Sequence, residues 1–304
     1  MQTMESRMHV PDQNQGSVTP LDLSSGRLRR AWQFARARGA RELARLVRRH
    51  GLRAAAYFVV SNVRHIVADR HARRWDRKNR VDTAGSIRLD GLTIIGPYRN
   101  EGNECLCTSP SSFRFMMNTL SVEFERFTFV DIGTGKGRTL LLASHYPFMQ
   151  IVGVEFAQEL IAVAQQNIMR YRQPSRRCYN IAVLEADATA YRFPDTPLVV
   201  YFYNPFSQSV FDQVLSHLEA SLRASPRDCV IVYGSSSHNA INWAKPAILH
   251  SGSFRQLETP AMPFFVDAVR TISYAVFAFR GKSAPLLEMA EAVLRPKSYA
   301  NNDR

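Results

Sequence analysis

The chain has 304 residues, an apolar content of 45% and a formal net charge of +13, so it is large enough to bury a substantial core. No apolar run reaches the length of a membrane-spanning helix, and the first residues lack the apolar centre of a secretory signal. The four cysteines are too scattered for a disulfide framework, and Cys105 and Cys107 lack the second Cys or His pair of a metal site. We therefore expect a reduced cytoplasmic protein without a metal centre, either free or peripheral to a membrane.

The N-terminal part of the chain divides into a polar tail and a strongly basic region. Residues 1–23 are rich in Gln, Ser, Thr and Pro and show little periodicity, which predicts a disordered tail. Residues 24–80 contain 17 Lys and Arg against three acids, a net charge of +14, so the rest of the chain is about neutral. Apolar residues at helical spacing predict a helix before Gly51 and a second, more apolar helix over 52–67.

Three uses of this basic helical region stay open. Its arginines could contact the phosphates of a nucleic acid. They could also lie on an anionic membrane surface, or face solvent while the apolar side packs on the rest of the protein. Aromatic residues such as Trp32 and Tyr57 among the arginines fit the first two uses and do not choose between them.

A connecting segment over residues 81–104 follows the basic region. Gly91, Gly96 and Pro97 interrupt it, and we expect it to help form a substrate entrance. Thr108 and Ser109 precede a proline, which is typical of a helix start, although either hydroxyl could also reach a ligand. The apolar residues of the helix that follows have the spacing of a packed face: Phe113, Met116, Met117 and Leu120.

The most informative motif follows this helix. Residues 129–138 read Phe-Val-Asp-Ile-Gly-Thr-Gly-Lys-Gly-Arg and lead into an apolar helical run. A buried strand thus ends in a loop in which Gly133, Gly135 and Gly137 permit positive φ angles and a close approach of a ligand to the main chain. The N–H groups at the start of the next helix would face that ligand. Lys136 is expected to point to solvent, and we expect no direct ligand contact from it or from Arg138.

Acidic residues end the next two predicted strands. Glu155 ends a strand over 151–155, about twenty residues past the glycines, where a carboxylate can accept both ribose hydroxyls of a nucleoside. Asp187 ends a strand over 181–187 and is placed to accept a hydrogen bond from an adenine amine, with the Ala188 N–H nearby.

A fourth predicted strand, over residues 198–203, runs directly into Asn204-Pro205-Phe206. The carboxyl ends of four strands would therefore meet at one crevice, where open α/β sheets bind their ligands.

The spacing of the glycines distinguishes this loop from a dinucleotide site. It reads D-x-G-x-G-x-G, whereas dinucleotide loops read G-x-G-x-x-G. The negative charge of Asp131 suits an ammonium or sulfonium group better than a pyrophosphate. An NAD-dependent oxidoreductase is therefore disfavoured, and the predicted strand after Thr271 also counts against it.

With these four motifs in register, residues 127–280 resemble the class I S-adenosylmethionine-dependent methyltransferases. The resemblance implies a Rossmann-like, seven-stranded, mostly parallel sheet with helices on both faces and an antiparallel last strand. The fifth to seventh strands would be residues 229–233, 254–257 and 272–279. It places the catalytic domain over residues 105–285, with a tail over 286–304. It implies S-adenosyl-L-methionine as cofactor, contacted by Asp131, Gly133, Gly135, Gly137, Glu155, Asp187, Ala188 and Asn204.

The resemblance also implies a role for Asn204, Pro205 and Phe206 in catalysis. Amino-group methyltransferases often carry Asn or Asp, two prolines, then Tyr or Phe, whereas this chain has one proline. Asn204 would position the nucleophile, and Phe206 or Tyr203 would wall the site, because methyl transfer depends mostly on alignment and desolvation. The alternative is a plain strand-ending turn.

We expect methyl transfer to a nucleophile, in the first place a nitrogen of a protein or small molecule, while oxygen and carbon acceptors stay open. The alternative is a non-catalytic module that binds cofactor or nucleic acid on the same fold.

Overall fold

The computed structural model describes residues 48, 66–87, 89, 91–99, 101–103, 107–235, 238–263, 266 and 272–279. The chain divides into two compact units, residues 1–61 and 62–304. Everything that follows concerns the second unit. The expected N-terminal tail, most of the basic region and the expected C-terminal tail lie outside the described residues.

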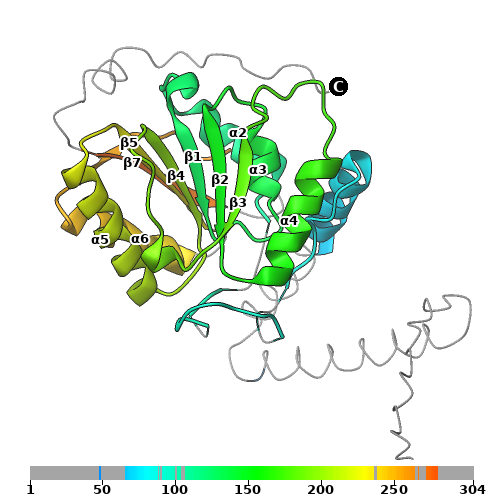
Figure 1. Ribbon diagram of the computed structural model, residues 1–304, viewed down its shortest axis with the longest axis horizontal. Helices are drawn as coiled ribbons and strands as arrows, with labels where there is room; N and C mark the ends of the chain where they lie inside the picture. Colours follow the sequence, from blue (N-terminus) through cyan, green and yellow to red (C-terminus); the bar gives the residue numbers. More distant parts are fainter. Residues whose placement is uncertain are drawn as a thin grey trace, which may run out of the picture. The chain divides into compact units, whose positions relative to one another are not determined.

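The core of this unit is a seven-stranded sheet with the strand order β3-β2-β1-β4-β5-β7-β6 (Figure 1). Its strands are β1 Thr128–Ile132, β2 Gln150–Glu155, β3 Ile181–Glu185, β4 Leu198–Tyr203, β5 Cys229–Ser235, β6 Phe254–Leu257 and β7 Ser273–Phe279. The first five strands pair in parallel, and β7 runs antiparallel to both β5 and β6. The expected mostly parallel sheet with an antiparallel last strand is confirmed.

The strand order reverses at β1, and this reversal positions the site. The chain adds β2 and β3 on one side of β1 and then returns to add β4 and β5 on the other side. Asp131 is level with Gly153 of β2 and Tyr201 of β4, so the three strands end together. Loops that leave a parallel sheet at such a reversal diverge and create a crevice at the carboxyl ends of the strands.

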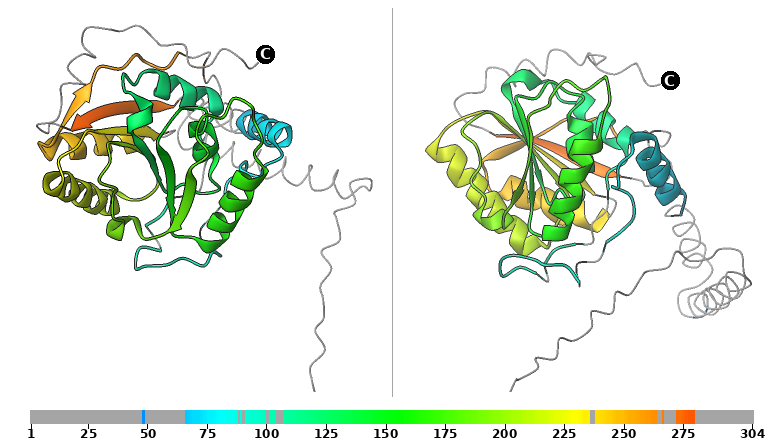
Figure 2. Two further views of the ribbon diagram at one scale, coloured as in Figure 1. Left: turned by 45° about the horizontal axis from the view of Figure 1, so that its top comes forward. Right: turned by 45° about the vertical axis from the view of Figure 1, so that its right-hand side comes forward.

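Helices cover both faces of the sheet (Figure 2). They are α2 Pro110–Asn118, α3 Arg138–Ala143, α4 Gln158–Arg170, α5 Gln208–Ala224 and α6 His238–His250, with short 3-10 helices η1 Phe124–Arg126 and η2 Ala188–Ala190. Residues of α2 and α3 belong to one hydrophobic cluster, and residues of α5 and α6 belong to the other. The central strands are buried throughout because side chains on both faces are covered.

The start of α2 was read correctly from the sequence. The Ser109 hydroxyl accepts a hydrogen bond from the Ser112 N–H at 3.1 Å, and Pro110 occupies the first helical position. Phe113, Met116 and Met117 are buried, as their spacing predicts. Among the described residues, no helix is both long and apolar enough to cross a membrane.

The described part of the basic region is a helix over residues 66–79, which extends well past the expected end of a helix at residue 67. Ala68, Ala72, Asp76 and Asn79 are buried and recur every three or four residues, so this helix packs along one face. Figure 1 shows the helix beside α4.

Candidate functional site

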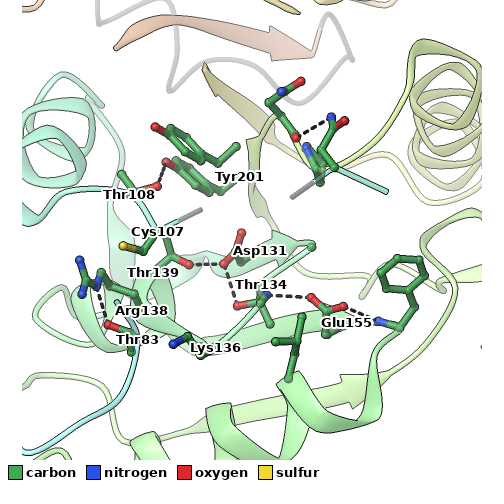
Figure 3. Close-up of a pocket in the computed structure, with 18 of the residues that line it drawn as sticks. Thr83, Cys107, Thr108, Asp131, Thr134, Lys136, Arg138, Thr139, Glu155 and Tyr201 are labelled. Carbon is green, nitrogen blue, oxygen red and sulfur yellow. Dashed lines mark hydrogen bonds between the residues drawn. The ribbon is translucent and has the colours of Figure 1, made fainter. Parts of the chain in front are cut away.

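A pocket lies at the carboxyl ends of β1, β2 and β4, where the strand order reverses (Figure 3). It encloses about 650 Å³ of space that protein atoms do not fill, part of it open to solvent. Eight residues that the sequence suggested for a site line it: Thr108, Asp131, Gly133, Gly135, Glu155, Tyr203, Asn204 and Pro205. Gly137, Asp187, Ala188 and Phe206 are not among the lining residues, and their roles stay predictions.

The glycine loop needs glycine both for its conformation and for its contacts. Gly133 has a φ of +79°, and a Cβ there would lie 2.6 Å from the Cβ of Pro205. Gly137 also has a φ of +79°, and a Cβ there would lie 3.0 Å from the Cβ of Ala164 on α4. Any other residue at these positions would strain the backbone and push the neighbouring element away. The loop is therefore packed directly against the turn after β4.

Asp131 is a buried carboxylate at the end of β1. Its Oδ2 accepts hydrogen bonds from the hydroxyls of Thr134, at 2.8 Å, and Thr139. Burial raises the pKa of Asp131 to about 6, although the two hydroxyl bonds act in the opposite direction. The ionised form thus carries a cost that no described salt bridge offsets.

Glu155 holds the glycine loop from the end of β2. Its Oε2 accepts a hydrogen bond from the Gly135 N–H at 2.7 Å. Its Oε1 accepts bonds from the N–H groups of Phe156 and Ala157, at 3.0 and 3.1 Å. Burial raises the pKa of Glu155, the three N–H donors lower it, and the charge of Asp131 raises it further. Glu155 lines the pocket, and its Oε2 accepts one hydrogen bond from the described residues, against two at Oε1.

Asn204 lies in a strained turn immediately after β4. Its φ of +47° is uncommon for a residue other than glycine. Its backbone carbonyl accepts a bond from the Asn103 side-chain amide at 3.0 Å, and the Pro205 carbonyl accepts one from the Asn103 N–H at 2.9 Å. The Asn204 Oδ1 accepts a long bond of 3.4 Å from the Tyr233 hydroxyl. Asn103 thus fixes the backbone of this turn and leaves the side-chain oxygen weakly engaged.

A family model described as a methyltransferase domain matches residues 129–225. The matched residues run from β1 to the end of α5, so this part of the chain resembles a methyltransferase domain. A search of curated proteins finds no match.

Three solved structures that are similar to this chain are also methyltransferases. The precorrin-6y C5,15-methyltransferase of Geobacter metallireducens GS-15 is 16% identical over 63% of this chain and 95% of its own, with a TM-score of 0.42. A ribosomal protein L11 methylase of Lactobacillus delbrueckii subsp. bulgaricus is 16% identical over 55% and 76%, with a TM-score of 0.37. The N-methyltransferase NodS of Bradyrhizobium japonicum WM9 is 10% identical over 55% and 97%, with a TM-score of 0.36.

Two cations, Lys136 and Arg138, are buried at the glycine loop, and the expectation that Lys136 points to solvent is wrong. Lys136 Nζ donates to the Asp82 carboxylate at 2.8 Å and to the Ala84 carbonyl. Arg138 Nε donates to the Thr83 hydroxyl at 2.5 Å. Residues 82–84, far away in sequence, supply the acceptors that let both cations stay buried.

Asp76 connects the helix over residues 66–79 to this loop. It accepts a charge-assisted bond from Arg138 at 2.8 Å, and the Arg138 guanidinium lies 4.9 Å from the centre of the Trp75 ring. Asp76 also accepts bonds from the Thr83 N–H and hydroxyl, both at 2.7 Å, and from the Ala84 N–H at 2.6 Å. Thr83 lines the pocket, so the segment after the helix is part of the pocket wall, and Asp76 joins the helix to that segment.

Residues 92–99 and 101–103, which we call the strap, cross the carboxyl edge of the sheet. Ile94 forms a β-bridge with Ala157, and Gly102 forms one with Phe206. Leu89 and Asn103 place the connecting segment in the pocket wall, and its expected role in a substrate entrance stays a prediction.

Asp187 lies beneath the strap. A Cβ at Gly96 would lie 2.6 Å from Asp187 Oδ2, so the strap backbone approaches this carboxylate closely. The other oxygen of Asp187 accepts bonds from the Thr189 N–H and hydroxyl, at 2.9 and 2.8 Å. Asp187 is thus the N-cap of η2, which begins at Ala188.

Several lining residues were not foreseen from the sequence. Phe156 lines the pocket and directly follows Glu155, so its position next to the predicted second-strand acid could have identified it. Thr108, which the sequence did suggest, lines the pocket and forms a buried 2.9 Å bond with the Tyr201 hydroxyl, whereas its neighbour Ser109 caps α2 and is not among the lining residues. Thr83 carried no local pattern that identified it. Its role depends on Asp76 and Arg138, and the latter is 55 residues away from it.

Proposed function

We propose that the methyltransferase domain binds S-adenosyl-L-methionine in the pocket at the ends of β1, β2 and β4. We further propose that it transfers the methyl group to a nucleophile, in the first place a nitrogen of a protein or small molecule. The observation that carries the cofactor proposal is the pair of buried carboxylates, Asp131 and Glu155. Neither forms a salt bridge with a Lys or Arg in the part of the chain that the structure describes.

A cationic ligand suits this pair of carboxylates. Burying a carboxylate without a counter-charge is unfavourable, and a cation bound in the same pocket offsets that cost. S-adenosyl-L-methionine carries a sulfonium and an ammonium group, whereas a dinucleotide would bring a negatively charged pyrophosphate toward Asp131. The cations that line the pocket do not reverse this argument, because Lys136 is paired with Asp82 and Arg138 with Asp76.

The residues present fit the proposed cofactor. The open main chain at Gly133 and Gly135 admits close approach, Glu155 Oε2 can accept a ribose hydroxyl, and Phe156 offers an aromatic wall. When bound, S-adenosyl-L-methionine supplies an electrophilic methyl group on its sulfonium. The protein's part is to orient the acceptor and exclude water, since methyl displacement needs little acid–base assistance.

Asn204 is the residue we propose for orienting the acceptor. Among the described residues, its side-chain oxygen accepts only the long bond from Tyr233, so it can accept a further hydrogen bond from an acceptor nitrogen. Tyr203 lines the same pocket. Phe206 instead packs in the core against Phe202, at 6.4 Å between ring centres, and supports the turn from behind.

Calorimetric titration of the full chain tests the cofactor proposal. We expect saturable binding of S-adenosyl-L-methionine and none of NAD, with binding weakened at least about tenfold in Asp131→Asn. The matched control is Asp212→Asn, an exposed acid on α5, which should bind as the unmodified chain does. Binding of NAD alone, or equal binding by both variants, would overturn the proposal.

Turnover separates an enzyme from a binding module. With a radiolabelled methyl donor and pooled protein and small-molecule acceptors, we expect label transfer that falls about tenfold or more in Asn204→Ala while cofactor affinity stays unchanged. Cofactor binding without any label transfer would favour the non-catalytic module. Transfer that is unaffected by the substitution would show that Asn204 does not orient the acceptor.

A further inference from the structure

A strongly basic surface lies outside the pocket. The exposed side of the helix over residues 66–79, with the residue after it, carries six cations: Arg70, Arg73, Arg74, Arg77, Lys78 and Arg80. The end of α4 and the segment after it carry four more, of which Arg176 is partly buried and the others are exposed: Arg170, Arg172, Arg176 and Arg177. We call these ten residues together with Tyr179 the basic face.

The two halves of the basic face are held together by direct contacts. Gln173 donates a hydrogen bond to the Asn79 side chain at 2.6 Å. The rings of Trp75 and Tyr171 lie 5.9 Å apart. Both views in Figure 2 show the helix beside α4. The cations of the two halves therefore form one surface.

Acidic residues do little to neutralise this surface. Residues 66–80 and 170–180 contain two acids, Asp69 and Asp76. Asp69 pairs with Arg73 at the surface, and Asp76 is buried against Arg138. Within these two described segments the basic face is therefore left with little counter-charge.

Tyr179 adds a flat aromatic surface within the arginines. It is 69% exposed, which is unusual for a large aromatic side chain. The Arg176 guanidinium lies 4.6 Å from the centre of its ring, and Arg176 is itself held by a 3.1 Å bond to the Tyr171 carbonyl. Stacked arginine and aromatic planes are what unpaired bases pack on, and arginines in number match phosphates.

We propose that the basic face binds single-stranded nucleic acid, with RNA as the probe. The arginines contact the phosphates, and the ring of Tyr179 stacks with a base. An anionic membrane would use the arginines as well, but it would gain little from a planar cation and ring pair. The proposal does not depend on methyl transfer, because binding is measured without cofactor or acceptor.

Fluorescence anisotropy with a labelled single-stranded RNA of about 20 nucleotides, titrated over a range of salt, tests the charge. We expect a triple variant of the full chain, Arg74→Gln with Arg77→Gln and Arg170→Gln, to bind RNA more weakly. The slope of log affinity against log salt concentration should also become shallower by up to about 2. The control removes three exposed charges outside the basic face, with the substitutions Arg192→Gln after η2, Arg223→Gln on α5 and Lys245→Gln on α6. It should leave both quantities unchanged.

Substitution at Tyr179 tests stacking separately. Tyr179→Ala should weaken RNA binding roughly 5- to 150-fold with little change in salt slope, and Tyr179→Phe should bind within about twofold of the unmodified chain. Circular dichroism and the melting temperature check that each variant is folded.

Several outcomes would overturn the proposal. They are no binding of RNA by the full chain, equal losses in the basic-face variant and its control, or no effect of Tyr179→Ala. Binding to vesicles of phosphatidylserine and phosphatidylcholine tests the alternative partner, an anionic membrane. Vesicle binding that depends on the basic face, together with RNA binding that does not, would make a membrane surface the partner.

Discussion

The carboxylates around the glycine loop fall into two groups that the fold treats in opposite ways. Asp76 is buried with a cation, Arg138, and receives three further hydrogen bonds from Thr83 and Ala84. Asp131 and Glu155 are equally buried, yet they receive only neutral hydroxyl and N–H donors. The first arrangement compensates its charge within the protein. The second leaves charge that a ligand can compensate.

This difference separates a structural role from a binding role for chemically identical groups. A buried acid with a cation loses stability when it is removed, because the partner is left uncompensated. A buried acid without a cation already carries an electrostatic cost, so neutralising Asp131 while an oxygen acceptor stays in place should stabilise the protein while function suffers. We therefore expect the free energy of unfolding to fall when Asp76 is replaced and to rise when the charge of Asp131 is removed.

The largest expected effect is at Asp76. Asp76→Ala leaves the Arg138 guanidinium buried without its anion and removes the acceptor for Thr83 and Ala84, so we expect a loss of about 3–5 kcal/mol in the free energy of unfolding. Urea unfolding followed by circular dichroism measures it.

Asp69→Ala is the matched control for this prediction. It removes an acid of the same helix whose 2.7 Å pair with Arg73 is exposed, and should cost about 0–1 kcal/mol. If both variants lost the same stability, Asp76 would not hold the helix to the glycine loop.

The sheet and the glycine loop could be read from the sequence, because they depend on local patterns. The apolar runs that end in Asp131 and Glu155 marked two strands whose structural bounds lie within a residue or so of the expected ones. Parallel strands buried on both faces leave this continuous apolar signature, and glycines in a left-handed turn are equally local.

The walls of the pocket could not be read in the same way. The bond from Arg138 to Asp76 spans 62 residues, and the one from Asn103 to Asn204 spans 101. Each joins polar residues that have no periodicity and that would be unremarkable on a surface. Their burial is decided only when the strap and the helix over residues 66–79 pack on the sheet. Lys136 was misread for this reason, since its acceptors at Asp82 and Ala84 are remote in sequence.

The second prediction concerns Asp131, where we expect the opposite sign. Both threonine hydroxyls donate to Oδ2, so the single oxygen of an asparagine can keep these bonds while the charge is lost. Asp131→Asn should raise the free energy of unfolding of the cofactor-free protein by about 1–3 kcal/mol near pH 7.5. The same substitution should weaken cofactor binding.

The pH dependence of stability checks the cause of this gain. The pKa of Asp131 in the folded protein, about 6, lies above the ordinary value of 3.8, so the folded state holds its proton more tightly than the unfolded state. The penalty is complete above pH 6 and disappears as the pH falls toward 4. The stability difference between Asp131→Asn and the unmodified chain should shrink over this window. A constant difference would mean that packing, and not charge, accounts for it.

The smallest expected effect is on cofactor affinity as a function of pH. If the ionised Asp131 attracts a sulfonium or ammonium group, protonation below pH 6 removes that attraction. The dissociation constant for S-adenosyl-L-methionine should then rise by at most about tenfold per pH unit below that value, and Asp131→Asn should show a flatter profile at weaker affinity. Calorimetry between about pH 7.5 and 5 measures both profiles. Parallel profiles in the two proteins would assign the attraction to Glu155 alone, because Glu155 is the other buried acid of the pocket and its pKa is also raised.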